Sequence, residues 1–109
     1  MRFNLQQMKD NKLYHILDLI EEIDKVDKML ILHKDSDSDL MLSQYKNQKL
    51  KLSNYLVKEL LTNSDNRTEV MYIIKLFIEK FYNNEMSHLQ FEENDNLKKI
   101  ENVFIENYA

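Results

Sequence analysis

Apolar residues recur at spacings of three and four along most of the chain, which is the pattern of amphipathic helices. Short polar turns between long helices favour antiparallel neighbours. The expected fold class is therefore all-α, an antiparallel helical bundle of three to four helices built on a long N-terminal helical hairpin, in a single domain that comprises the whole chain. The helices are expected over about 5–34, 38–62, 67–82 and 96–107.

Two polar breaks delimit the three longer helices. Residues 34–39 hold short Asp and Ser side chains, which compete for backbone hydrogen bonds and favour turns and N-caps. At the second break, Asn66 is followed three residues later by Glu69, the spacing of a capping box. Residues 83–95 are predicted to form a polar linker, with either one irregular turn or a short strand over 88–92.

The helix expected over 67–82 is the most apolar segment, and Val70 to Ile74 is the longest unbroken apolar run in the chain. A helix that is apolar over a wide arc is normally covered by neighbours on more than one side. We therefore expect this helix to be central in the bundle. Leu, Ile, Val and Phe make up 34 of the 109 residues, which is enough apolar material for a core.

Polar residues interrupt the predicted interface of the hairpin. Asp27 projects near the middle of the apolar arc of the first helix, Asp24 lies on its flank, and Lys49 stands at an inward position of the second. Antiparallel folding is expected to bring Asp24 opposite Lys49, and Asp27 opposite Tyr45 or Lys46. We predict that either Asp24 or Asp27 pairs with Lys49. Such a pair costs stability but can fix helix register. Alternatively, Lys49 extends along the apolar surface to solvent and both aspartates lie at the rim.

The second helix also carries a stripe of apolar residues on the side opposite its main one. Leu50, Val57 and Leu61 form this stripe. Exposed apolar stripes of that length usually mark contacts. We therefore predict that the stripe is an interface, covered either by the C-terminal helix of the same chain or by a second subunit.

One segment of the chain has the spacing of calcium ligands. Asp35, Asp37 and Asp39 alternate as carboxylates do in an EF-hand loop. That loop also needs Gly at its sixth position and Glu at its twelfth, where this chain has Leu40 and Lys46. The expected role of the three aspartates is therefore an acidic turn, without a metal ion.

Other chemistry is largely excluded by the composition. Without cysteine or glycine there is no thiolate zinc site, Gly-rich phosphate loop or nucleophile elbow. Glu85 and His88 match one half of a Glu-x-x-His di-metal motif, whose second copy is missing. The sequence therefore predicts no enzyme, and no catalytic, cofactor-binding or metal site.

Charge and hydropathy bear on compartment and partners. The net charge of −4 argues against nucleic acid and anionic membranes as partners, because both attract basic surfaces. The N-terminus has no apolar run of signal-peptide length, and no run is long enough to cross a bilayer. We therefore expect a cytoplasmic protein. The abundance of Asn, Lys and Ile over Gly, Ala and Pro also indicates a low-GC source.

Two function classes follow from these features. The first is a non-catalytic helical protein that acts through protein–protein interaction, with another protein or with itself as a homodimer. The alternative is a small acidic inhibitor of a macromolecular target, of the immunity-protein, antitoxin, anti-CRISPR or nucleic-acid-mimic type. The alternative requires Asp35, Asp37 and Asp39 to join neighbouring acids in one contiguous patch.

Overall fold

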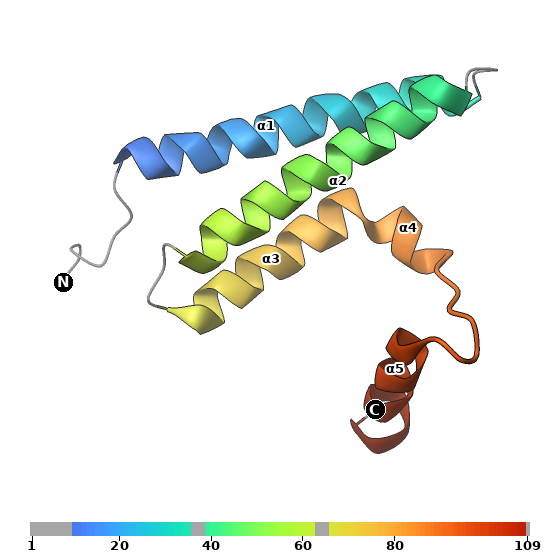
Figure 1. Cartoon of the computed structure of the whole chain (residues 1–109). Coiled ribbons are helices and arrows are strands. Elements are labelled where there is room, and N and C mark those ends of the chain that lie inside the picture. The colour runs from blue at the N-terminus through green and yellow to red at the C-terminus, as the bar shows by residue number, and fades with distance from the viewer. Residues whose placement is uncertain (1–9, 36–38, 63–65, 109) are drawn as a thin grey trace.

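The computed structural model describes residues 10–35, 39–62 and 66–108 of the chain, and those residues form an all-helical structure (Figure 1). The predicted all-α hairpin fold is confirmed. The strand considered for 88–92 is absent, and the predicted helix start near residue 5 lies outside the described residues. The helices are α1 (Asp10–His33), α2 (Asp39–Thr62), α3 (Arg67–Phe81), α4 (Asn83–Ser87) and α5 (Asn96–Tyr108).

Helices α1 and α2 form the antiparallel hairpin (Figure 1). Near the closed end, the rings of His33 and Tyr45 stack with their centroids 5.9 Å apart. Near the open end, the ammonium of Lys12 binds the carboxylate of Glu59. Contacts at both ends of the hairpin show that the two helices stay together over their length.

Helix α2 lies between α1 and α3, so α2 is the central helix (Figure 1). The prediction that the most apolar helix would be central is wrong. Helix α3 buries one side against the hairpin and leaves Tyr72, Ile73 and Leu76 exposed on another. The apolar arc of α3 is wider than the surface that the hairpin covers, so part of this arc stays exposed.

The core draws on all three long helices. Ile23 and Leu56, from α1 and α2, are the largest fully buried side chains among the described residues. Burial of a side chain of this size stabilises the fold by about 1.5–3 kcal/mol. The remaining buried members of this cluster are Ile16, Leu19, Leu60, Val70, Phe77 and Phe81.

Side chains and turns define the ends of α3. The side-chain oxygen of Asn66 accepts a hydrogen bond from the backbone N–H of Glu69 at 3.1 Å, which confirms the predicted N-cap. At the other end, the helix stops at Phe81 and Tyr82 bonds back to the carbonyl of Ile78 at 2.8 Å. The short helix α4 then follows directly, within the segment predicted as a linker.

Helix α5 stands away from the three long helices, at the end of an irregular segment over 88–95 (Figure 1). Its first turn is capped by Asp95, whose carboxylate accepts from the N–H of Leu97 at 2.7 Å. None of the described side chains of α5 belongs to the buried core. The radius of gyration is 17.0 Å, against about 13 Å for a compact domain of this length. The chain therefore has a three-helix body and a projecting helical arm.

Candidate functional site

A buried lysine joins four helices at the centre of the body. The side chain of Lys49, on α2, is only 4% exposed, and its ammonium nitrogen lies 2.8 Å from a carboxylate oxygen of Asp27 on α1. The same nitrogen lies 2.8 Å from a carboxylate oxygen of Glu85 on α4. Its third bond goes to the main-chain carbonyl of Phe81, the last residue of α3. An ammonium has three N–H donors, so Lys49 is fully satisfied.

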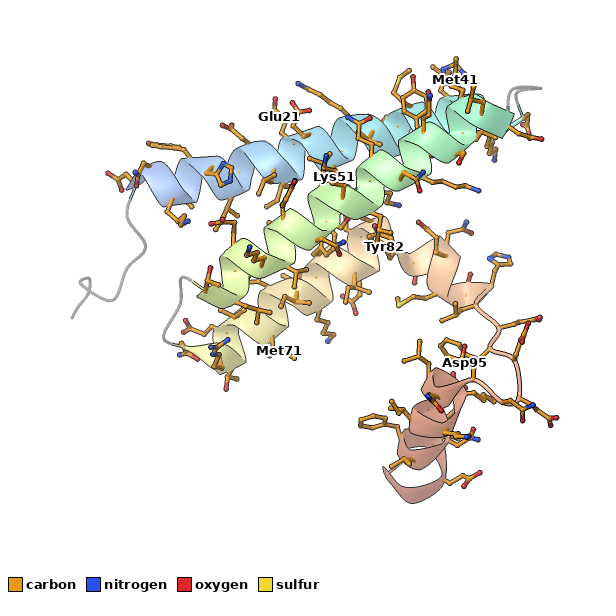
Figure 2. The ribbon with its side chains drawn as sticks, in the orientation of Figure 1. Glu21, Met41, Lys51, Met71, Tyr82 and Asp95 are labelled. Atoms are coloured by element: carbon orange, nitrogen blue, oxygen red, sulfur yellow. The ribbon has the colours of Figure 1, made fainter. Side chains whose placement is uncertain are left out.

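An aromatic ring and a hydroxyl complete the surroundings of Lys49. The ammonium lies 4.4 Å from the ring centroid of Tyr82, within the range of a cation–π interaction. The hydroxyls of Tyr82 and Ser53 are 2.8 Å apart, and Ser53 also donates to the carbonyl of Lys49 at 2.7 Å. Figure 2 shows Tyr82 at the corner between α3 and α4. We call Lys49, Asp27, Glu85, Tyr82 and Ser53 the lysine cluster.

The lysine cluster explains how α3 ends in a chain without glycine. Helices often end with a glycine in the left-handed conformation, which lets the chain satisfy the last carbonyls. This chain has no glycine, and none of the described residues has a positive φ. Lys49 instead donates to the carbonyl of Phe81 and places a positive charge at the negative end of the helix dipole. A side chain of α2 thus terminates α3.

Burial and ion pairing have opposite effects on the charge of Lys49. Burial by itself lowers the pKa of the ammonium, because desolvation penalises the charged form. Hydrogen bonds and charge attraction from Asp27 and Glu85 outweigh this penalty, and the pKa of Lys49 is raised above 10.5. Lys49 is therefore held charged, with no lone pair available to act as a base or nucleophile. We interpret the cluster as an architectural element.

Asp24 does not reach Lys49. Its carboxylate lies 2.8 Å from the ammonium of Lys28, one turn further along α1, and this contact raises the pKa of Lys28. Of the two predicted partners of Lys49, Asp27 is the one that pairs with it, one helical turn from the register that placed Asp24 opposite Lys49. Tyr45 stacks on His33 instead of facing Asp27.

Several members of the lysine cluster were missed by the sequence analysis. Glu85 and Tyr82 lie more than thirty residues after Lys49 in the chain, and nothing in their local pattern points toward it. Ser53 had a usable signal, because it lies four residues after Lys49 and so shares its helix face. A second polar residue on that inward face indicates a buried hydrogen bond, and Ser53 bonds to the carbonyl of Lys49 and to the hydroxyl of Tyr82.

The stripe predicted as an interface is partly covered. Val57 and Leu61 pack against the core cluster. Leu50 is 54% exposed, and it lies next to Lys49, at the level where α3 ends. The three residues therefore do not form one continuous exposed surface.

The candidate metal ligands are not brought together. Asp35 and Asp39 are exposed, and Asp37 lies outside the described residues. Glu85 binds Lys49, and His88 contacts the carbonyl of Asn84 at 2.9 Å. Over 10–35, 39–62 and 66–108, no three His, Asp or Glu side chains gather as they would around a metal ion.

Exposed apolar residues of the described chain include one group on α3 and one on α5. The α3 flank consists of Tyr72, Ile73 and Leu76, which are 56%, 42% and 42% exposed. The arm face lies on α5, and its residues are between 46% and 63% exposed. It consists of Leu97, Ile100, Val103, Phe104 and Ile105.

Within the described part of the chain, no helix combines the length and hydropathy needed to cross a bilayer. Comparison of the chain with protein-family models, curated proteins and solved structures finds no match. The function therefore has to be argued from the body, the lysine cluster and the two exposed apolar surfaces.

Proposed function

We propose that this protein is a non-catalytic interaction module that binds another protein chain through the arm face of α5. The observation that carries the proposal is the exposure of that face: Leu97, Ile100 and Ile105 are each more than half exposed on a helix separate from the core. A lone amphipathic helix of this length is marginal in water and gains stability from packing its apolar face. Binding in a groove of a partner supplies that packing.

The lysine cluster supports the same proposal, because it connects the base of the arm to the hairpin. Glu85 belongs to α4, the short helix that precedes the arm, and it binds Lys49 at 2.8 Å. Tyr82, immediately before α4, lies under the same ammonium. The point from which the arm departs is thus held against the hairpin. An arm with a fixed base loses less freedom on binding than a loose tail.

The acidic inhibitor remains an alternative hypothesis. It requires Asp35, Asp37 and Asp39 to join neighbouring acids in one contiguous patch, and α1, which ends just before them, carries acids of its own. There Lys25 lies 3.3 Å from Glu21 and 3.9 Å from Glu22, while Lys28 binds Asp24. Acids interspersed with lysines do not favour binding to a basic target. No feature of α1 therefore supports the inhibitor over the interaction module.

A cytoplasmic location belongs to the same proposal and rests on the sequence alone. The low-GC source inferred from composition is likewise a hypothesis about the origin of the chain.

The proposal is tested by capture of binding partners with the tagged full chain, compared with Ile100→Glu in the arm face. The matched control is Leu32→Glu, at a 72% exposed position on α1. We expect a bound protein that is lost with Ile100→Glu and retained with Leu32→Glu. Its affinity for the purified full chain should also fall with Ile100→Glu in a titration. A binding profile unaffected by Ile100→Glu would show that α5 is not the binding element.

A further inference from the structure

We propose that the corner between α3 and α4 is a conformational switch, in which Lys49 holds the two helices apart and its withdrawal lets them join into one continuous helix over 67–87. The arm follows α4 along the chain, so joining the two helices would redirect it (Figure 1). This inference goes beyond the proposed function, because it concerns the position of the arm and does not depend on what the arm binds.

A single residue, Tyr82, separates α3 from α4. Its backbone angles are φ −127° and ψ 8°, against about −63° and −42° in an α-helix. Both backbone groups of Tyr82 nevertheless have helical partners, because its N–H bonds to the carbonyl of Ile78 at 2.8 Å and its carbonyl accepts from the N–H of Met86 at 2.9 Å. A rotation of about 65° in φ and about 50° in ψ at this one residue therefore brings the corner to helical angles.

Lys49 binds the two residues that a continuous helix would bond to each other. In an α-helix each carbonyl accepts from the N–H four positions later, so the carbonyl of Phe81 would accept from the N–H of Glu85. In the structure, that carbonyl accepts from the ammonium of Lys49, and the carboxylate of Glu85 lies 2.8 Å from the same ammonium. The contacts of Lys49 therefore favour the bent arrangement over the continuous helix.

The hairpin holds Lys49 in position. Its ammonium lies 2.8 Å from Asp27, and its side chain is 4% exposed. Ser53, one turn further along α2, bonds to the carbonyl of Lys49 and to the hydroxyl of Tyr82. The side chain of Glu85, in contrast, is 50% exposed. The fixed side of the contact thus lies on the hairpin, and its accessible side lies on the helix that moves.

The sequence of the corner permits both arrangements. Residues 67–87 include no glycine or proline, the two residues that most disfavour a helix interior. Asn83 and Asn84 are only moderate helix formers, so the segment does not strongly favour a continuous helix either. Joining the helices gives partners in α3 to the first N–H groups of α4, which have none within α4, and it removes the contacts of Lys49 to Phe81 and Glu85. Each arrangement thus satisfies hydrogen bonds that the other does not, as a two-state element requires.

The switch couples binding at the arm to the state of the body. A partner shifts a two-state equilibrium only by the difference between its affinities for the two states. Because α4 and α5 change position relative to the hairpin, a chain that contacts both the arm and the hairpin binds the two arrangements differently. Such a partner selects one direction of the arm.

The test is a distance across the corner, measured by pulsed electron paramagnetic resonance between two spin labels. The chain has no cysteine of its own, so Met71→Cys and Met86→Cys place one label on α3 and one on α4. These positions are 60% and 46% exposed. In a continuous helix they would be about 22 Å apart, at 1.5 Å per residue. We expect a shorter distance in the labelled protein without further substitutions, because the chain bends at Tyr82.

Two substitutions weaken the hold of Lys49 on the corner. Glu85→Ala removes only the exposed carboxylate, whereas Lys49→Met removes both contacts, and circular dichroism checks that each variant folds. We expect a population at about 22 Å to appear with Glu85→Ala and to dominate with Lys49→Met. The matched control is Glu79→Ala, an exposed acid on α3, which should leave the distance unchanged.

Amide hydrogen exchange gives a second measurement of the same change. In the continuous helix the N–H groups of residues 83–85 gain partners, so they should exchange at least about tenfold more slowly in Glu85→Ala than in wild type. Straightening in Lys49→Met alone would still support the inference and assign the hold to the carbonyl of Phe81.

Two results would overturn the inference. One is a distance of about 22 Å in the labelled protein without further substitutions, because the corner would then be absent. The other is a short distance and fast exchange in both Glu85→Ala and Lys49→Met, because the bend would then not depend on Lys49. If Lys49→Met does not fold, Glu85→Ala decides alone.

Discussion

The ammonium of Lys49 lies 2.8 Å from the carboxylate of Asp27 and is the centre of a contact that joins α1 to α2. The lysine side chain is 4% exposed and the aspartate 23%. A buried pair of this kind adds little net stability, because desolvation offsets the attraction. Its loss is costly for a different reason, since removal of one partner leaves the other charge poorly solvated.

We predict that Lys49→Met destabilises the protein by about 3–5 kcal/mol and Asp27→Asn by about 1–3 kcal/mol. Asp27→Asn costs less because Lys49 keeps Glu85 and the carbonyl of Phe81. A double-mutant cycle by urea denaturation should give a coupling of about 1–3 kcal/mol between Lys49 and Asp27. The matched control is Asp24→Asn, for which coupling to Lys49 should be near zero. Equal coupling for both aspartates would contradict the observed register.

Stability should fall on the alkaline side through Lys49. Its pKa in the folded state is raised above the ordinary value of 10.5. The folded state therefore holds the proton more tightly than the unfolded state, and the contribution is complete below about pH 10.5. It is lost as the pH rises through the folded-state pKa. The difference in unfolding free energy between wild type and Lys49→Met, followed by urea denaturation from pH 8 to about pH 12, should shrink at the upper end. A constant difference would mean that the ammonium pKa is not raised.

The N-cap of α3 should contribute to stability. We expect Asn66→Ala to lower the unfolding free energy by about 1 kcal/mol, because the N–H of Glu69 loses its acceptor. Asn54→Ala is the control, at an exposed position within α2, where alanine is the better helix former and stability should rise by a few tenths of a kcal/mol. Thermal denaturation of both variants measures the two effects. A loss of stability in both variants would argue against a specific cap.

We expect calcium and zinc to leave the melting temperature unchanged. A ligand that binds only the folded state must raise the melting temperature as its occupancy rises. Glu85 is engaged by Lys49, and His88 by the backbone of Asn84. Differential scanning fluorimetry with millimolar calcium and with micromolar zinc tests this. A rise of many degrees would reveal a site that includes residues outside 10–35, 39–62 and 66–108.

The arrangement of the helices along the chain could be predicted from the sequence. Apolar spacings of three and four are a local property, and the start of α3 depends on the nearby Asn66, whose cap was predicted and is present. The all-α hairpin fold follows from the same information, because two long helices joined by a short turn must pack antiparallel.

The order of the helices in space could not be predicted in this way. The high apolar content of α3 indicated a central helix, but the structure places α2 between α1 and α3. Hydrophobicity reports how much surface a helix can bury, whereas connectivity and packing decide how much it does bury. The exposed α3 flank is apolar surface that α3 could bury but does not bury in this fold.

For the lysine cluster, too, one part could be predicted from the sequence and the other could not. The sequence by itself determined that Lys49 interrupts an apolar stripe and that an aspartate of the first helix was available to it. Tertiary structure alone decided that Asp27, one turn from Asp24, is the partner, and that Glu85, Tyr82 and the carbonyl of Phe81 complete the site. A shift of one helical turn keeps the same face of each helix buried, so periodicity cannot distinguish the two registers. The bonds of Lys49 to Phe81 and Glu85, which lie 32 and 36 residues further along the chain, form only when α3 and α4 pack against the hairpin.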